Sequence, residues 1–300
     1  MITTPTVLVL GAGASAPFGF PAGIDLRKKI LHDLRGKNGG GVEWLQRAGY
    51  ALDDICRFHD AFLYSGKESV DAFLEHRPDC IEVGKTAIAQ ALIPCEQVGA
   101  LFNEHGNLYS YLFRHLNTPL DKFADNKLSI VTFNYDRSFE HYLFTALKNS
   151  FRLDHKHAAE LLNSIPVVHL HGHLGLLPWQ GEGGRDYVSE CQPHDIRNAG
   201  RTIKIIHEAA EGDPEFENAR ELIKGAEKLI FLGFGYDATN VKRLKINFGR
   251  EPRLQIFGSC LGLTLVEITA ISSFLFQGQL QPGKNGHDAL TFLREMIALS

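Results

Sequence analysis

Cysteine is scarce and scattered in this chain of 300 residues, and no two cysteines form a C-x-x-C pair. The total is odd, and the positions lie far apart: Cys56, Cys80, Cys95, Cys191 and Cys260. Zinc ribbons and redox motifs require paired spacing, and an even count is typical of a disulfide scaffold. We therefore expect free thiols, no disulfide framework and no cysteine-based zinc module.

Long apolar runs and a strong excess of charge are also missing. No run approaches the roughly 20 apolar residues of a membrane span, and the N-terminus lacks the basic region, apolar core and cleavage site of a signal peptide. The net charge of -4 gives no general attraction to nucleic acid or anionic lipid. We therefore expect a cytoplasmic protein that binds neither nucleic acid nor a membrane directly. Any small anionic ligand would be held by the dipoles of local N–H groups.

Short apolar runs rich in β-formers alternate with helical stretches along most of the chain. Each run ends in a polar or glycine-bearing turn, and together they cover residues 6–10, 128–133, 167–170, 228–232 and 253–257. This alternation predicts an α/β fold with a doubly wound, parallel, Rossmann-like sheet. Ligands of such sheets bind at the carboxyl ends of the strands.

The segment between the first two strands has helical character instead. From residue 43 to about residue 116, apolar side chains such as Val70, Phe73 and Leu74 recur at three- and four-residue intervals. The pattern predicts a mostly helical subdomain at about 43–120, inserted in a single domain that spans residues 1–300.

The first strand runs into a glycine turn, GAGAS at residues 11–15. Gly11, Gly13 and Ser15 stand where backbone N–H groups and a helix start can meet a pyrophosphate, although a tight turn alone would also explain the glycines. The third glycine of G-x-G-x-x-G is missing, and no acidic residue stands clearly at the end of a second strand. Both absences disfavour an ordinary dehydrogenase.

Two short polar side chains, Asn134 and Asp136, follow the second strand. Residues two apart in an extended chain point the same way, so we expect both to face one ligand site. Asp136 is also suited to cap the helix expected from residue 137, and the two roles are compatible.

Three histidines alternate near the end of the third strand: His169, His171 and His173. A continued strand would place all three on one face, as a metal site requires. Gly172 is expected to break the extended chain, and no acidic ligands stand nearby, so we expect no metal. His171, at the strand end, is the expected catalytic residue, and the other two histidines are expected to pack or to lie at the surface.

In order and in strand context, these motifs resemble those of the sirtuins. The likeness is closer to the bacterial sirtuin-like NAD hydrolases of anti-phage systems such as Thoeris. Residues 11–21 (GAGASAPFGFP) are similar to the family's G-A-G-x-S-x-x-x-G-I-P, and residues 134–136 (NYD) to its N-x-D. Residues 171–172 (HG) are similar to its catalytic H-G, and residues 233–235 (GFG) to its late glycine turn. The resemblance extends along nearly the whole chain.

The resemblance implies an enzyme whose substrate is NAD. The pyrophosphate would be held by the residues of the first turn, Gly11, Ala12, Gly13 and Ser15. Asp136 would touch the carboxamide of the nicotinamide. The adenosine side would be contacted by residues that follow the later strands, Gly233, Phe234, Gly258 and Ser259.

The same resemblance implies the catalytic roles. Asn134 would hold the nicotinamide ribose or the attacking water. His171 would act as a base toward a ribose hydroxyl or water, since an imidazole of ordinary pKa, about 6.5, is largely able to accept a proton near neutral pH.

Departures from the sirtuin pattern narrow the range of activities that the resemblance implies. Sirtuin deacylases carry Asp-Phe-Arg after the proline of the first motif, whereas this chain has AGI at residues 22–24. They also carry a four-cysteine zinc module after H-G, whereas this chain has only Cys191 between His171 and Gly233. The stretch 69–75 (SVDAFLE) is similar to the defence-type branch. These features favour an NAD glycohydrolase that releases nicotinamide and ADP-ribose and depletes NAD in abortive infection. The alternatives are an NAD-dependent protein deacylase and a non-catalytic regulatory module that binds NAD or ADP-ribose.

Control of such an enzyme would come from outside its catalytic residues. A chain of 300 residues leaves little room for a separate sensor domain. We therefore expect a homo-oligomer, or a partner protein such as a motor ATPase or an infection sensor.

Overall fold

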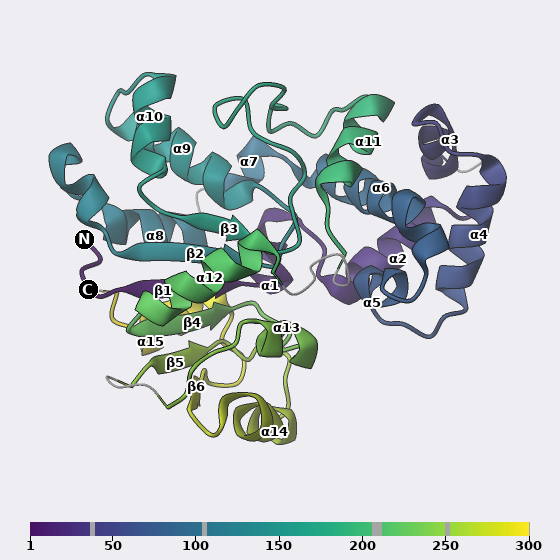
Figure 1. Cartoon of the computed structure of the whole chain (residues 1–300). Coiled ribbons are helices and arrows are strands. Elements are labelled where there is room, and N and C mark those ends of the chain that lie inside the picture. The colour runs from purple at the N-terminus through teal and green to yellow at the C-terminus, as the bar shows by residue number, and fades with distance from the viewer. Residues whose placement is uncertain (37–39, 104–106, 206–211, 250–252, 300) are drawn as a thin grey trace.

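A six-stranded parallel sheet forms the centre of the computed structural model, which describes residues 1–36, 40–103, 107–205, 212–249 and 253–299 (Figure 1). The strand order is β3-β2-β1-β4-β5-β6, and every neighbouring pair is parallel. The strands are β1 (Thr6–Leu10), β2 (Leu128–Thr132), β3 (Val167–His169), β4 (Lys228–Leu232), β5 (Gln255–Gly258) and β6 (Leu280–Pro282). The predicted Rossmann-like α/β fold is confirmed.

Strand β1 is buried on both faces, which explains its unbroken apolar sequence. Val7 and Val9 pack into the core on one side of the sheet, whereas Leu8 and Leu10 pack into the core on the other side. Successive side chains of a strand point to opposite faces, so a strand covered by helices on both sides needs apolar residues at every position.

Helices cover both faces of the sheet, as a doubly wound fold requires. The core on the side of Leu8 includes side chains of α8 (Leu108–Leu116), α9 (Ser138–Ser150) and α15 (Ala289–Met296). The core on the side of Val7 includes side chains of α12 (Pro214–Gly225), α13 (Ala238–Arg243) and α14 (Leu265–Phe276).

The connection from β1 to β2 is helical, which confirms the predicted helical insertion. Its helices before α8 are α1 (Ala12–Ser15), α2 (Gly23–Asp33), α3 (Gly40–Arg47), α4 (Leu52–Leu63), α5 (Val70–Leu74), α6 (Ile81–Leu92) and α7 (Val98–Leu101). Figure 1 shows α2 to α6 grouped beside the sheet. Helix α6 is buried along most of its length and serves as the centre of this group.

Within the described residues, two further helices and four short 3-10 helices complete the fold. Helix α11 (Pro193–Thr202) comes after β3 yet packs against α6. A side chain at Gly200 would come within 2.8 Å of the Thr86 hydroxyl, so glycine allows this close approach. The other segments are α10 (His155–Leu162) and the 3-10 helices Ala16–Phe18, Pro78–Cys80, Ile93–Cys95 and Leu120–Asp125.

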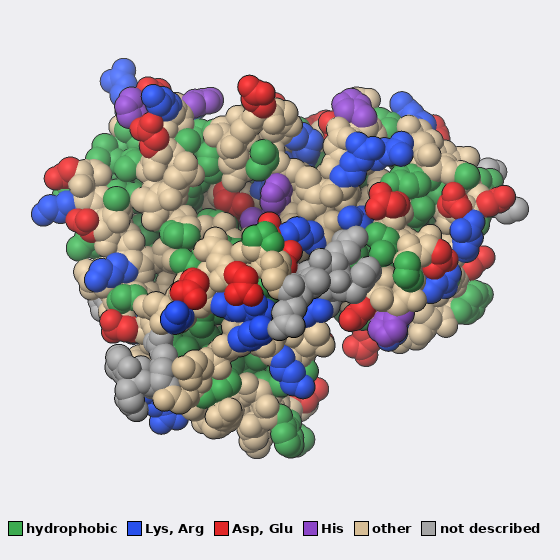
Figure 2. Space-filling view, in the orientation of Figure 1, with side chains coloured by type: hydrophobic (Ala, Val, Ile, Leu, Met, Phe, Trp, Pro, Cys, Tyr) green, Lys and Arg blue, Asp and Glu red, His purple; other side chains and the backbone are tan. Residues whose placement is uncertain are grey.

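Charged side chains of both signs are interspersed over the face of the molecule shown in Figure 2. This mixture agrees with the small net charge of -4. Among the described residues, no helix combines the length and the apolar character that crossing a membrane requires.

Candidate active site

The strand order reverses between β1 and β4, and this reversal defines where a ligand is expected to bind. From β1 the chain builds the sheet in one direction through β2 and β3, and β4 begins the other half. In open parallel sheets of this kind, ligands bind in the crevice outside the carboxyl ends of the strands at the reversal. The glycine turn after β1 and the polar residues after β2 all lie at this end.

The turns after β1 and β4 are packed directly against each other. The Gly13 N–H donates to the Gly233 carbonyl at 2.9 Å. A Cβ atom on Gly11 would lie 2.6 Å from that same carbonyl oxygen. Gly233 has a positive φ of +58°, and a Cβ there would lie 2.1 Å from the Ala14 nitrogen. Only glycine fits these positions, so close packing of the two turns accounts for Gly11, Gly13 and Gly233 without a ligand.

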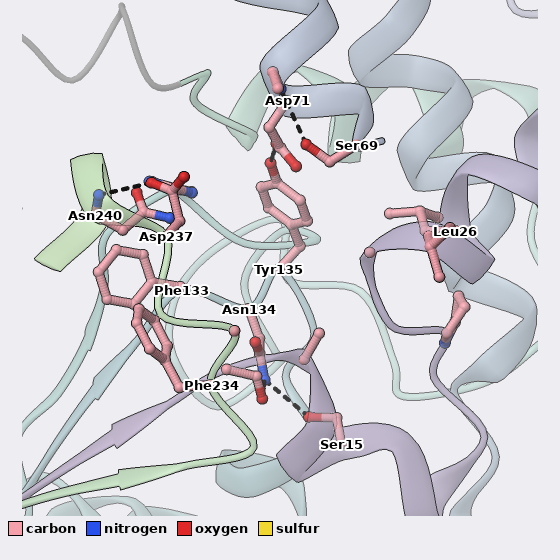
Figure 3. A pocket seen from close by; sticks show the side chains of 18 of the residues that line it. Ser15, Leu26, Ser69, Asp71, Phe133, Asn134, Tyr135, Phe234, Asp237 and Asn240 are labelled. Carbon is pink, nitrogen blue, oxygen red and sulfur yellow. Dashed lines mark hydrogen bonds between the residues drawn. The ribbon is translucent and has the colours of Figure 1, made fainter. Parts of the chain in front are cut away.

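A cavity of about 430 Å³ opens beside these turns, within the size range of small-molecule sites. Seven of the residues predicted for the site line it, and they come from four separate segments of the chain: Gly11, Ala12, Ser15, Asn134, Asp136, His171 and Phe234. Figure 3 shows the side chains of Asn134, Tyr135 and Ser15 in this cavity. Convergence of distant segments on one cavity is what a binding site requires.

Asn134 is held rigidly, and its amide orientation follows from its partners. Its Nδ2 donates to the Gly11 carbonyl at 3.0 Å and to the Ser15 hydroxyl at 3.1 Å. Because a carbonyl oxygen can only accept, Nδ2 must face Gly11. Oδ1 lies on the other side of the amide carbon, away from Gly11. Asn134 therefore presents a hydrogen-bond acceptor on the side opposite the glycine turn.

Strand β2 ends one residue earlier than the sequence pattern predicts. Its last residue is Thr132, and the Asn134 N–H donates to the Thr132 hydroxyl at 3.0 Å. Asn134 therefore uses a local side-chain partner instead of a neighbouring strand. Both Asn134 and Asp136, two residues apart, line the cavity.

Asp136 is buried, and its carboxylate accepts hydrogen bonds at the start of α9. Its Oδ1 accepts from the Ser138 N–H at 3.1 Å and from the Ser138 hydroxyl. Burial raises the pKa of the carboxyl above its ordinary value, and hydrogen bonds from Ser138 and Ser15 oppose this rise in part. The helix-start role weighed from the sequence is therefore present, and the same residue lines the cavity.

His171 lies in an aromatic surrounding with little polar support. Only 4% of its side chain is exposed, and the Phe133 ring meets it edge-on at 5.3 Å between centroids. Its Nε2 is buried and has no hydrogen-bond partner. Desolvation lowers the pKa of the imidazole, against smaller opposing effects of nearby carboxylates such as Asp71. His171 is therefore neutral at physiological pH and able to accept a proton.

His169, two residues earlier, is fully engaged in hydrogen bonds. Its Nε2 lies 2.7 Å from Glu140 Oε1, and its Nδ1 lies 3.0 Å from the Asn134 carbonyl oxygen. Both partners are acceptors, so both ring nitrogens carry protons when Glu140 is ionised. Burial lowers the pKa of His169, but the charge and hydrogen bond of Glu140 outweigh burial and raise it above its ordinary value. His169 thus ties the backbone of Asn134 to α9.

His173 takes no part in the cavity. Its ring packs edge-on against His169 at 5.4 Å, and burial lowers its pKa to about 4. Gly172, with a φ of +71°, turns the chain between His171 and His173. No group of three His, Cys, Asp or Glu side chains within the described residues is arranged to hold a metal ion.

A buried ion pair organises the segment that follows Gly172. Arg137 is 1% exposed, and its guanidinium contacts both Glu96 oxygens at 2.9 and 2.7 Å. It also donates to the carbonyls of Leu176 and Arg185, both at 2.9 Å. The segment between β3 and α11 is thus anchored by an arginine at the start of α9.

Gly258 and Ser259, at the end of β5, are not among the residues that line the cavity. The Ser259 hydroxyl accepts from the Gly233 N–H at 2.8 Å. A side chain at Gly258 would collide with the Tyr236 hydroxyl. Both residues therefore contact the turn after β4.

The cavity also contains residues that the sequence analysis does not assign. Helix α5 and the residues before it contribute Glu68, Asp71 and Glu75, and the Tyr135 hydroxyl donates to Asp71 across the cavity (Figure 3). Asp237 and Asn240 line it from the segment after β4. The stretch 69–75 (SVDAFLE), singled out in the sequence analysis, contributes Asp71 and Glu75 to this wall.

The structure is that of an α/β protein with a Rossmann-like sheet and a cavity at the reversal of its strand order. Comparison with known proteins adds no family to this description, because no family model and no curated protein matches the sequence significantly.

Proposed function

We propose that this protein is an NAD glycohydrolase that cleaves NAD and water into nicotinamide, ADP-ribose and a proton. The observation that carries the proposal is that Asn134 and His171, from different strand ends, line one cavity at the switch point of the sheet. The Asn134 amide is oriented with Nδ2 toward Gly11 and Oδ1 away from it, and His171 is a neutral imidazole. Such a pair is suited to orient and deprotonate a nucleophile.

The chemistry asks little of the protein beyond positioning and electrostatics. Nicotinamide leaves as a neutral pyridine from a cationic one, and the ribose passes through a transition state resembling an oxocarbenium ion. The carboxylates of Glu68, Asp71 and Glu75 line the cavity and favour positive charge on the sugar. In this mechanism the Asn134 Oδ1 accepts a hydrogen bond from the attacking water or a ribose hydroxyl, and His171 takes the proton.

Assignments for the rest of NAD follow the resemblance described above. The turn at Gly11, Ala12 and Ser15 borders the cavity and is suited to the pyrophosphate. Phe234 supplies an aromatic surface, while Gly233 and Ser259 act indirectly by shaping its turn. We further propose that the enzyme depletes NAD in the cytoplasm during anti-phage defence, as a homo-oligomer or with a partner protein.

The test is nicotinamide release from NAD by purified protein, alone and with infected-cell extract as a source of activator. We expect release by the wild type and a loss of about 100-fold or more in Asn134→Ala and in His171→Ala. His141→Phe is the matched control, because His141 also packs on an aromatic ring, 4.4 Å from Tyr187, but lies outside the cavity.

Two results would argue for other functions, and a third would argue against the assigned residues. Turnover that depends on an acylated peptide would indicate a deacylase. Tight NAD binding without turnover under any condition would indicate a regulatory binding module. Unchanged release in both Asn134→Ala and His171→Ala would contradict the residue assignment.

A further inference from the structure

Two residues that line the cavity each carry a buried polar atom without a hydrogen-bond partner. These atoms are Nε2 of His171 and Oδ1 of Asn240. Buried polar atoms in folded proteins almost always have a partner, so an orphaned atom at a cavity indicates a position where a ligand completes the hydrogen bond. The mechanism proposed above uses His171 but leaves Asn240 without a role.

The backbone of Asn240 is fixed independently of its side chain. Its N–H donates to Asp237 Oδ1 at 2.9 Å, which caps the start of α13. The next residue, Val241, is 3% exposed and anchors the helix in the core. The Asn240 side chain therefore does not cap the helix, and the helix fixes the position of Asn240 at the cavity.

An aromatic surface lies on the same side of the cavity. Figure 3 shows Asn240 and Asp237 on the same side as the rings of Phe133 and Phe234. The centroids of these two rings are 5.0 Å apart. The two ring planes are inclined at 55° to each other, so a flat ring of a ligand would pack on one of them, and an N–H donor on that ligand would suit the carbonyl oxygen of Asn240.

We propose that Asn240 Oδ1 accepts a hydrogen bond from the amino group of a planar ring of the bound dinucleotide and thereby determines substrate specificity. This inference rests on the proposed function. Two rings of NAD carry an amino group at their edge: the adenine, and the nicotinamide through its carboxamide. An analogue with oxygen in place of that nitrogen would leave Oδ1 unpaired or place a second acceptor against it.

The experiment compares the dissociation constants of three dinucleotides by calorimetry: NAD, its hypoxanthine analogue and its nicotinic acid analogue. The hypoxanthine analogue lacks the amino group of the adenine, and the nicotinic acid analogue lacks that of the carboxamide. The wild type should bind one analogue about 10- to 100-fold more weakly than NAD. The analogue that is rejected identifies which ring faces Asn240.

Three variants determine whether Asn240 causes the preference. In Asn240→Leu the preference should fall to near unity, whereas Asn240→Asp, which retains an acceptor oxygen, should keep it. Thr239→Val is the matched control, because Thr239 lines the cavity on the same helix, and it should keep the wild-type preference. Melting temperatures establish that all three variants are folded.

The outcomes separate this inference from the proposed function. A preference that survives unchanged in Asn240→Leu, or a wild type that binds all three dinucleotides equally, would overturn the role of Asn240. Nicotinamide release by the same wild-type sample would leave the glycohydrolase proposal intact in that case. A wild type that binds none of the three would overturn both.

Discussion

Two histidines separated by a single residue occupy opposite environments in this molecule. His169 donates to a carboxylate and to a backbone carbonyl, and its pKa is raised. His171 lies among aromatic rings with an unpartnered Nε2, and its pKa is lowered. Of these two imidazoles, that of His169 is therefore a buried cation, and that of His171 is a neutral ring that can accept a proton.

The difference between the two environments separates a residue that positions a neighbour from a residue that is available to a ligand. The cation of His169 fixes the backbone of Asn134 through a 3.0 Å contact, which requires a complete set of partners. In the proposed mechanism, the imidazole of His171 exchanges a proton with a ligand, which requires a ring nitrogen without a protein partner. Four predictions sharpen this comparison, in order of decreasing effect.

Replacing His171 with phenylalanine should separate activity from stability. Nicotinamide release should fall by about 100- to 10,000-fold, because the general base is lost. The melting temperature should stay unchanged or rise, since a ring without a polar atom fits the surrounding of Phe133, Tyr135 and Phe216. Release assays and thermal unfolding measure the two effects, and a parallel loss of both would contradict the assigned role.

Replacing His169 with leucine should destabilise the protein by about 3–5 kcal/mol, because Glu140 is left as an uncompensated buried charge. The double variant Glu140→Leu/His169→Leu should regain much of this stability but not the activity, since the Asn134 carbonyl still lacks its donor. Chemical denaturation gives the stabilities. Glu160→Gln, in the exposed pair with Lys156, is the control and should change stability by less than about 0.5 kcal/mol. Full activity in the double variant would exclude a positioning role.

The two histidines should impose opposite pH dependences on stability. The folded pKa of His171 is below the ordinary value of 6.5, so its effect is to lower stability as pH falls below about 6.5. The folded pKa of His169 is raised, so its contribution is fully present below 6.5 and is lost as pH rises through the folded value. Melting curves from pH 5 to 9 should flatten on the acid side in His171→Phe and on the alkaline side in the double variant Glu140→Leu/His169→Leu, which removes His169 without leaving Glu140 to titrate as a buried, unpaired carboxyl. Curves parallel to the wild type would refute these assignments.

The smallest effect is expected from Asp71→Asn. The Asp71 carboxylate raises the pKa of His171 slightly against the larger effect of burial. Its removal should therefore move the acid limb of the pH–rate profile to lower pH and reduce kcat by less than about tenfold. Tyr135→Phe, which removes the hydroxyl that bonds to Asp71 but keeps the charge, should leave the acid limb in place. A shift to higher pH would reverse the assigned electrostatics.

The sequence predicts the sheet and the gathering of motifs well, because both follow from local pattern. Strand β1 has the predicted bounds, and the polar residues after β2 and β3 reach the cavity because parallel strands end at one edge. Strand β6 is not predicted, since three residues reading LQP carry no β pattern of their own and extend only by pairing with β5.

Contacts between distant elements are what local pattern cannot supply. Glu140 reads as an ordinary helix residue in the sequence, yet it determines the protonation of His169 across 29 positions. Asn240 likewise has no motif, and its orphaned oxygen is recognised only once the cavity is known. The sequence analysis therefore missed Glu140 and Asn240, whereas most of the residues that it assigned at the ends of β1, β2, β3 and β4 line the cavity, and those at the end of β5 do not.

Hydrolysis in water enriched in oxygen-18 tests the central claim most directly. The account predicts equimolar nicotinamide and ADP-ribose from the wild type, with one labelled oxygen in the ADP-ribose, and neither product above background from His171→Phe. Nicotinamide release by His171→Phe at the wild-type rate would contradict the assignment of His171 as the base that acts in this cavity.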